Sequence, residues 1–263
     1  MRKQLKICIT QQNRICRMDD FLSLQDQNIL ITGASSGMGR VFAQMIARQG
    51  ARVSLLARNE ERLKQTLDSL EGHGHKMYIC DLTDEGQLKD TVIDMEPLDG
   101  IVLCAGINNF VPVKFIKQDK IEKMFQTNYF SQLLLIQMLL KKKLVCKGGS
   151  IVFISSISSM LGVQGTLLYA SSKGAINSAV RVMAAELASQ KIRVNAICPG
   201  IVRTEMLSGT NLEEDTFTKQ AGLYPLGLGS PEDVGNAVLF HLSDASKWLT
   251  GQCMVLDGGF TLN

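Results

Sequence analysis

The sequence predicts one doubly wound α/β domain, in which helices cover both faces of a parallel sheet of about seven strands. From Asn28 onward, short apolar runs rich in β-branched residues alternate with longer amphipathic stretches. Strands separated by helices of this length form parallel, right-handed crossovers. Several runs are apolar on both faces, as in a sheet buried on both sides. The 263 residues contain no internal repeat and no Pro/Ser-rich linker, which fits a single domain.

The strands and helices are expected in regular alternation. The β-branched runs predict strands at Asn28–Thr32, Arg52–Ala57, Lys76–Cys80, Gly100–Cys104, Ser150–Ser155, Arg193–Ile197 and Cys253–Leu256. The amphipathic stretches between them predict helices at Met38–Gln49, Glu60–Leu70, Asp84–Ile93, Ile121–Lys141, Leu167–Ser189 and Pro231–Leu242.

The first 20 residues do not continue this alternation. They are basic, and their only apolar stretch, Ile7–Ile9, is too short for the apolar region of a secretory signal peptide. We expect residues 1–20 to be a flexible tail, or Met18 to be the true start, and residues 21–263 to be the folded domain. A chain that starts at Met18 should then fold and react like the full one.

Composition excludes several classes of function. The net charge of +3 is too small for a nucleic-acid-binding surface, and the longest apolar run, Leu133–Leu140, is too short to span a bilayer. The seven cysteines, an odd number with no CxxC pair, predict reduced thiols in the cytoplasm. His73 and His75 have metal-like spacing, but two ligands in a loop are too few for a closed site. We therefore expect no metal, no nucleic acid and no membrane partner.

A glycine-rich segment, Thr32–Gly39, lies between the first strand and the first helix. We expect Gly33 to permit a tight turn, Gly37 to let the backbone approach a pyrophosphate, and Gly39 to allow close helix–strand packing. The amide groups at the start of the helix would hold the phosphates. The spacing is GxxxGxG without a following Gly-Lys-Ser/Thr, which excludes a P-loop. The candidate cofactor-binding residues here are Gly33, Ser35, Ser36, Gly37, Met38 and Gly39.

A second group of residues points to acid–base chemistry. Tyr169 and Lys173 are four residues apart in a helical stretch and therefore share one face. A tyrosine has a pKa of about 10 in water, and a neighbouring lysine cation favours its phenolate form. Ser156 ends a strand thirteen residues before Tyr169, and its hydroxyl could orient a substrate carbonyl. Ser155 is a neighbouring alternative for that role.

These motifs form part of a longer set. It comprises TGxxxGxG at Thr32–Gly39, Asp81-Leu82, Ala105-Gly106, Asn128, Ser156, Tyr169-Ala-Ser-Ser-Lys173, Pro199-Gly200-Ile-Val-Arg-Thr204, Pro231–Val234, Gly251-Gln252 and Asp257–Gly259. In this order and at these spacings, from Phe21 to Leu262, the set resembles the short-chain dehydrogenase/reductase family. Its general pattern is similar to that of 3-oxoacyl-acyl-carrier-protein reductases. The resemblance implies a Rossmann domain and an NADP(H)-dependent oxidoreductase that interconverts a carbonyl and a secondary alcohol.

The resemblance also implies a role for each matching residue. Tyr169 would be the general acid/base, and Lys173 would lower its pKa and bind the nicotinamide ribose. Ser156 would orient the carbonyl, and Asn128 would hold a water molecule that relays protons toward Lys173. Asp81 would contact the adenine, and Val202 and Thr204 the carboxamide. The remaining cofactor contacts would be Leu82, Cys104, Ala105, Gly106, Pro199 and Gly200. Cys104 stands where the family usually has asparagine, and we expect this small residue to be tolerated and unreactive.

The end of the second strand predicts the choice of coenzyme. Sites selective for NAD usually place an acid there, about 20 residues after the glycine loop. This chain has Ala57 followed by Arg58, whose guanidinium can grip a 2′-phosphate. NADP(H) is therefore preferred over NAD(H). In the competing interpretation Arg58 projects into solvent and Glu60 or Glu61 reaches the ribose.

The substrate is less well defined. By resemblance, Glu205–Tyr224 would be the lid that shapes the substrate pocket. Related acyl-carrier reductases tend to grip their acidic carrier with two arginines, whereas the matching positions here are Lys147 and Gln190, with Lys191 adjacent. We expect a small carbonyl or alcohol substrate, a homotetramer or homodimer, and an acyl carrier protein as a candidate partner. The alternative is a non-catalytic dinucleotide-binding regulator on the same scaffold.

Overall fold

The computed structural model describes residues 8–9, 15–16, 22–203 and 221–262. Its largest element is a seven-stranded parallel sheet with the order β5-β4-β3-β6-β7-β8-β9. The strands are β3 (Asn28–Thr32), β4 (Arg52–Ala57), β5 (Lys76–Ile79), β6 (Leu98–Leu103), β7 (Val145–Ile154), β8 (Arg193–Pro199) and β9 (Cys253–Leu256). The expected doubly wound α/β fold is confirmed.

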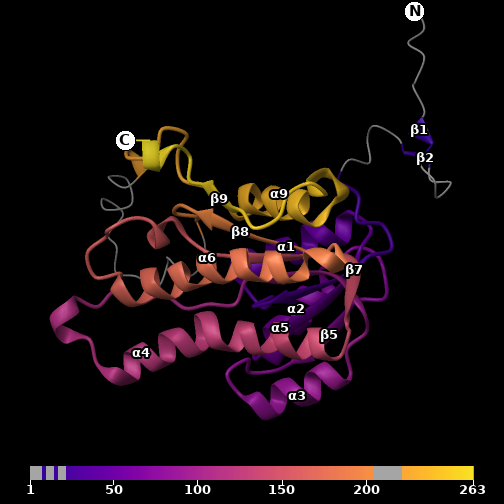
Figure 1. The fold of residues 1–263 in the computed structure, drawn as a ribbon, viewed down its shortest axis with the longest axis horizontal. Helices are drawn as coiled ribbons and strands as arrows, with labels where there is room; N and C mark the ends of the chain where they lie inside the picture. Colours follow the sequence, from indigo (N-terminus) through magenta and orange to yellow (C-terminus); the bar gives the residue numbers. More distant parts are fainter. Residues whose placement is uncertain (1–7, 10–14, 17–21, 204–220, 263) are drawn as a thin grey trace, which may run out of the picture.

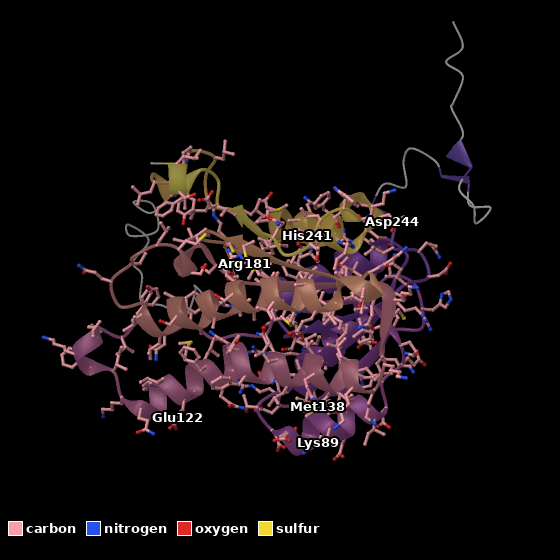
Figure 2. All side chains as sticks on the ribbon, in the orientation of Figure 1. Lys89, Glu122, Met138, Arg181, His241 and Asp244 are labelled. Atoms are coloured by element: carbon pink, nitrogen blue, oxygen red, sulfur yellow. The ribbon has the colours of Figure 1, made fainter. Side chains whose placement is uncertain are left out.

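Helices cover both faces of this sheet (Figure 1). One face carries α1 (Gly37–Arg48), α2 (Glu60–Asp68) and α9 (Pro231–Leu242), and the other carries α3 (Glu85–Ile93), α5 (Ser131–Lys141) and α6 (Leu167–Leu187). Successive strand residues alternate between the two cores, so Ile29 belongs to the first and Leu30 to the second. Charged side chains such as Lys89 on α3 and Glu122 on α4 (Gln118–Phe125) project away from the sheet (Figure 2).

Side chains cap the starts of α2, α3 and α9, whereas the start of α1 has no such cap. Asn59 and Asp84 cap α2 and α3 through side-chain oxygens that accept backbone N–H groups, and Ser230 and Asp233 form a reciprocal capping box on α9. Ser36 stands at the N-cap of α1 but makes no such bond, and no acidic residue lies in the first turn. The N-terminus of α1 therefore keeps its amide groups and its positive dipole available.

The order in which strands are added to the sheet reverses between β3 and β6, which are parallel neighbours. Thr32 at the end of β3 pairs in register with Leu103 at the end of β6. The loops after these two strands therefore leave the sheet side by side at its carboxyl edge. In open α/β sheets this reversal point is where ligands bind.

The prediction of one helix over Ile121–Lys141 is wrong in its centre. The chain forms α4, then a π-helical segment at Gln126–Phe130, then α5. A π-turn adds one residue to a helical turn and shifts its side chains relative to the regular helix. Here the shifted residue is Asn128, which is fully buried and bonded to the loop after β6.

Some predicted elements differ at their ends or lie outside the described residues. β7 starts at Val145, because this residue pairs with Leu98 ahead of a register irregularity. In the N-terminal segment, β1 (Cys8–Ile9) pairs antiparallel with β2 (Ile15–Cys16). Thr204 and most of the predicted lid, residues 204–220, lie outside the described part of the chain. No helix within the described residues is long and apolar enough to cross a membrane.

Candidate active site

The glycine loop adopts backbone conformations that require its glycines. Gly33 has φ = 69°, and a Cβ built on it would lie 2.9 Å from Ala105 Cα. Gly37, the first residue of α1, has φ = 52°. A Cβ on Gly39 would overlap the carbonyl of Gly33. The three glycines therefore bring the turn, the start of α1 and the loop after β6 into close contact.

Arg40, which the sequence analysis did not single out, anchors this loop. Its guanidinium donates hydrogen bonds to Ser35 O (2.8 Å) and to Thr66 Oγ1 on α2 (3.2 Å). Ser35, Ser36 and Met38 surround the uncapped start of α1. The arrangement offers backbone N–H donors and a helix dipole to an anion, as the glycine motif predicts.

The loop after β6 is tied to β3 by Thr32. The Thr32 hydroxyl oxygen accepts hydrogen bonds from the backbone N–H groups of Cys104 and Ala105, both at 3.1 Å. On the other side, the buried Gln132 of α5 donates to Ala105 O at 2.6 Å. The side chains of Thr32 and Gln132 thus hold this loop through its backbone groups, none of which belongs to the Cys104 side chain.

Tyr169 and Lys173 lie on the first turns of α6, as predicted. Lys173 is only 4% exposed, and its Nζ donates a hydrogen bond of 2.7 Å to Ile154 O at the end of β7. The same Nζ lies 5.7 Å from the centroid of the Tyr169 ring. Burial lowers the pKa of the Lys173 ammonium to about 8.

The pKa of the Tyr169 phenol differs from what the sequence predicts. Burial raises the pKa of Tyr169, and the hydrogen bond with Ser156 acts in the opposite direction. The sequence analysis expected Lys173 to lower this pKa. In the structure Ser156 acts in that direction, but the effect of burial is larger and leaves the pKa of Tyr169 raised.

The two candidate serines have different hydrogen-bond partners. Ser155 Oγ donates to Lys173 O at 3.2 Å and is buried beneath α6. Ser156 Oγ accepts from Ser158 N at 3.1 Å and bonds the phenol of Tyr169. This geometry favours Ser156 as the residue that could touch a substrate.

Asn128 positions the loop after β6 through its side chain. Its Oδ1 accepts from Ile107 N (2.8 Å), and its Nδ2 donates to Ile107 O (2.9 Å) and Ser172 Oγ (3.1 Å). A Cβ built on Gly106 would lie 3.3 Å from Asn128 Oδ1 and 3.6 Å from Lys173 Nζ. The space beside both groups exists because residue 106 is glycine. The water relay through Asn128 stays a prediction.

Arg58 leaves the sheet directly after Ala57, the last residue of β4, while Glu60 and Glu61 lie in the first turn of α2. The Arg58 side chain is 77% exposed, and its guanidinium lies 3.8 Å from Asp81 Oδ2, beyond the end of β5. Hydrogen bonds from Thr83 hold the pKa of Asp81 below its usual range, with a smaller contribution from Arg58. The adjoining Leu82 is buried. No acidic residue occupies the end of β4.

The remaining predicted contacts follow β8. Pro199 ends that strand, and a Cβ on Gly200 would lie 2.8 Å from the Tyr224 ring. Val202 is buried and forms a β-bridge with Gly229. This loop lies next to the loop after β7, since β7 and β8 are neighbours.

No group of three or more His, Cys, Asp or Glu side chains that could hold a metal is present in the part of the chain that the structure describes. His75 Nδ1 accepts a hydrogen bond from Val53 N at 3.0 Å. His73 and His75 both lie in the loop before β5, where His75 caps a backbone N–H of β4.

Together these features define a dinucleotide site. An uncapped helix N-terminus, a glycine turn and Gly106 lie at the reversal point of a parallel sheet, beside a buried lysine and a tyrosine. The described residues therefore fit a phosphate-bearing dinucleotide. This is the architecture of a nicotinamide-dependent oxidoreductase.

Comparison with known proteins gives the family. Residues 33–261 match the family model described as "Enoyl-(Acyl carrier protein) reductase". The chain belongs to the short-chain dehydrogenase/reductase family, whose members use nicotinamide dinucleotide cofactors, and it is an oxidoreductase of that family.

Similar proteins differ in the substrates that their names give. A mouse 3-oxoacyl-[acyl-carrier-protein] reductase is 34% identical over 90% of this chain and 99% of its own. A chloroplastic tropinone reductase homolog of Arabidopsis thaliana is 32% identical over 99% of this chain and 81% of its own. A short-chain type dehydrogenase/reductase from Mycobacterium marinum has a TM-score of 0.84 and 31% identity, covering 93% of this chain and 99% of its own.

Proposed function

We propose that the chain is an NADP(H)-dependent oxidoreductase that interconverts a carbonyl and a secondary alcohol, with Tyr169 as general acid/base. The observation that carries this proposal is the meeting of Ser156, Tyr169 and Lys173 at the carboxyl edge of the sheet, beside Gly106. Gly33, Gly37 and the start of α1 would hold the pyrophosphate, and Lys173 the nicotinamide ribose.

The proton chemistry follows from the protonation states of these groups. The raised pKa keeps the Tyr169 phenol protonated at neutral pH, so in the direction of reduction it can donate its proton to the carbonyl oxygen. Ser156 would hold that oxygen by a hydrogen bond. The dinucleotide, when bound, supplies the hydride for the carbonyl carbon. In the reverse direction the phenolate accepts the alcohol proton, and the Lys173 cation stabilises it.

Two observations support NADP(H) over NAD(H). The end of β4 carries Ala57 in place of an acid, which removes repulsion toward a 2′-phosphate. Arg58 stands next to it with an exposed guanidinium. Its guanidinium lies 3.8 Å from Asp81 Oδ2, at the same edge of the sheet as the glycine loop.

The surroundings of Tyr169 support a substrate with an apolar portion. A pocket of about 390 Å³ is lined mainly by apolar surface from Phe110, Pro112 and Val113. Its other wall is Gln164 and Gly165, just before α6, and Val111 N donates to Gly165 O at 2.8 Å across it. We propose a 3-oxoacyl thioester as the substrate class. The exposed Lys147 and Lys191 make an acidic carrier protein a partner to be tested.

We also propose a homo-oligomer that pairs through the outer surface of α4–α6. Ile121, Phe130, Leu167 and Val182 are exposed there, although they are large and apolar. A second copy of the chain would bury them. Light scattering after size exclusion should give a dimer or tetramer, and Val182→Asp should shift it toward the monomer.

The function is tested with a panel of carbonyl substrates read by NADPH absorbance. We expect turnover of a 3-oxoacyl thioester, faster on acyl carrier protein than on a short thiol if the carrier is recognised. No turnover on any substrate, together with retained NADPH binding, would instead favour a dinucleotide-binding regulator.

A further inference from the structure

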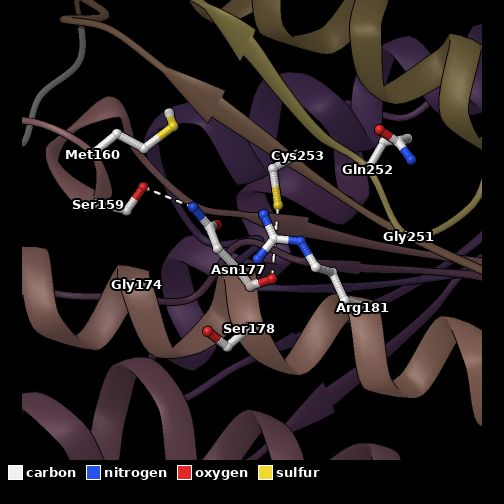
Figure 3. A pocket seen from close by; sticks show the side chains of 9 residues that line it. All are labelled: Ser159, Met160, Gly174, Asn177, Ser178, Arg181, Gly251, Gln252 and Cys253. Carbon is white, nitrogen blue, oxygen red and sulfur yellow. Dashed lines mark hydrogen bonds between the residues drawn. The ribbon is translucent and has the colours of Figure 1, made fainter.

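A second pocket lies further along α6, away from the apolar pocket near Tyr169. Its volume is about 530 Å³, and its lining includes Asn177 and Arg181 of α6 and Cys253 at the start of β9 (Figure 3). Tyr169, Lys173, Asn177 and Arg181 are successive members of one i, i+4 row of the helix. The row that carries the candidate acid–base pair thus ends in this pocket, which the proposed function leaves unused.

Two cysteines from adjacent strands meet at the floor of this pocket. Ala196 of β8 pairs with Cys253 of β9, so Cys198 lies diagonally across from Cys253 on the same face of the sheet. Cys198 Sγ donates to Asn177 Oδ1 and Cys253 Sγ to Asn177 O, each at 3.8 Å. Cys198 is fully buried, whereas Cys253 is partly exposed and lines the pocket. Only the second thiol is accessible.

The charges around Cys253 favour its thiolate. The neighbouring Cys198 thiol is the largest influence and, with the Arg181 guanidinium, lowers the pKa of Cys253 to about 7 against the opposing effect of burial. Cys198 responds in the opposite sense and stays protonated. Within the described residues, Arg181 has no carboxylate partner within 4.0 Å. Figure 3 shows its guanidinium next to Cys253.

We propose that Cys253 is a site of reversible S-thiolation by a small acidic disulfide, whose carboxylate is held by Arg181. A nucleophilic thiolate, a cation and a pocket large enough for a small peptide occur together here. The disulfide bond of such a reagent can react with the thiolate, its carboxylate can pair with the cation, and its size fits the pocket. The polar groups of Ser159, Ser178 and Gln252 line the same pocket and offer further hydrogen bonds.

The exchange needs no external oxidant. The Cys253 thiolate attacks one sulfur of the disulfide, a new S–S bond forms, and the original S–S bond breaks. Half of the reagent leaves as a thiolate, which takes a proton from water. Cys253 is oxidised as the disulfide is reduced. Cys198 keeps its proton, because its interaction with Cys253 and its burial raise its pKa.

The other described cysteines provide internal controls. Burial raises the pKa of Cys104 to about 12 and raises that of Cys80. Cys146 is partly exposed like Cys253, but burial and the carboxylate of Asp99 raise its pKa. An acidic disulfide should therefore react at Cys253 and leave Cys146 unmodified.

The test uses the reduced, full-length chain and oxidised glutathione as the probe, at neutral pH, with peptide mapping by mass spectrometry. We expect one glutathionyl group on Cys253 that dithiothreitol removes, and none after Cys253→Ser. Arg181→Gln should slow the reaction roughly two- to fivefold, the range for an exposed charge pair. The same variant should not slow the reaction with cystamine, a cationic disulfide. Arg62→Gln on α2 is the matched control and should leave both rates unchanged.

Three results would overturn the proposal. They are preferential modification of another cysteine in the wild-type chain, an Arg181→Gln variant with an unchanged rate toward oxidised glutathione, and a Cys198–Cys253 disulfide as the main product. The mapping is made on the wild-type chain, so it holds even if a variant folds poorly.

Discussion

The Arg58 guanidinium and the Asp81 carboxylate lie 3.8 Å apart, across the ends of β4 and β5. The sequence assigns both to the adenosine half of the dinucleotide, Arg58 to the 2′-phosphate and Asp81 to the adenine. Their pairing places the cation and the carboxylate side by side at one edge of the sheet. An exposed pair of this kind contributes little to stability, so its importance lies in binding.

Arg58→Ala should therefore change the choice of coenzyme. We expect the Kd for NADPH to rise about tenfold or more, because a charge-assisted contact to a phosphate is lost, while the Kd for NADH changes little. Fluorescence titration of both coenzymes measures this. Arg62→Ala, an exposed arginine on α2, is the control. A wild-type chain that binds NADH as tightly as NADPH would contradict the assignment.

Tyr169→Phe should abolish most turnover without loss of coenzyme binding. The ring still packs on α6, but the proton donor is gone, and general acid–base groups typically contribute 10²–10⁴-fold. Steady-state kinetics with a saturating coenzyme measures kcat. Tyr78→Phe on β5 removes a buried hydroxyl that has no hydrogen-bond partner among the described residues, and it should leave kcat unchanged. Near-normal turnover in Tyr169→Phe would remove this residue from the mechanism.

Thr32→Val should damage the site more than Cys104→Ala. The valine keeps the shape of threonine but leaves the N–H groups of Cys104 and Ala105 without their acceptor, which costs about 1–3 kcal/mol in the free energy of unfolding. Cys104→Ala keeps both bonds, so its effect should be smaller. Urea denaturation and NADPH titration of the two variants test this order. The reverse order would mean that the Cys104 side chain itself supports the loop.

His241 should make the fold sensitive to acid. Burial, with the nearby Arg193 cation, lowers the pKa of His241 to about 4 from 6.5, and neither ring nitrogen has a partner among the described residues. The unfolded chain therefore binds more protons between pH 6.5 and pH 4, and the free energy of unfolding falls as the pH decreases through this window. The full loss is on the order of 3 kcal/mol.

His241→Leu should remove this dependence and raise stability at neutral pH, because two unpartnered polar atoms leave the core. Denaturation at pH 4.5 and pH 7 compares the variant with the wild type. His73→Gln, at an exposed loop position, is the control. If the acid profile of His241→Leu matches that of the wild type, other groups account for the acid sensitivity.

The sequence was sufficient for the strands because their apolar runs are short and well separated. It failed at the π-helical segment, where the amphipathic pattern continues without interruption from α4 into α5. A π-turn inserts one residue into the backbone hydrogen bonding and leaves no gap in the apolar pattern.

The candidate site was predictable to the extent that its residues form local motifs. The glycine turn and the Tyr169/Lys173 pair each depend on spacing within one segment. The contacts of Arg40 with Thr66 and of Cys198 with Cys253 join different elements, and they depend on strand register and helix packing. Such contacts have no pattern in the linear sequence.

The hydrogen bond from Lys173 Nζ to Ile154 O orders this lysine side chain on folding, before any ligand binds. A free lysine side chain has rotamer entropy worth up to about 2 kcal/mol, which disappears wherever the ammonium is immobilised. Here the last carbonyl of β7 immobilises it as the sheet forms. A ligand that needs this ammonium meets a preorganised donor, and its affinity is not reduced by the ordering of a long side chain. The entropy of this side chain is lost on folding and does not have to be lost again on binding.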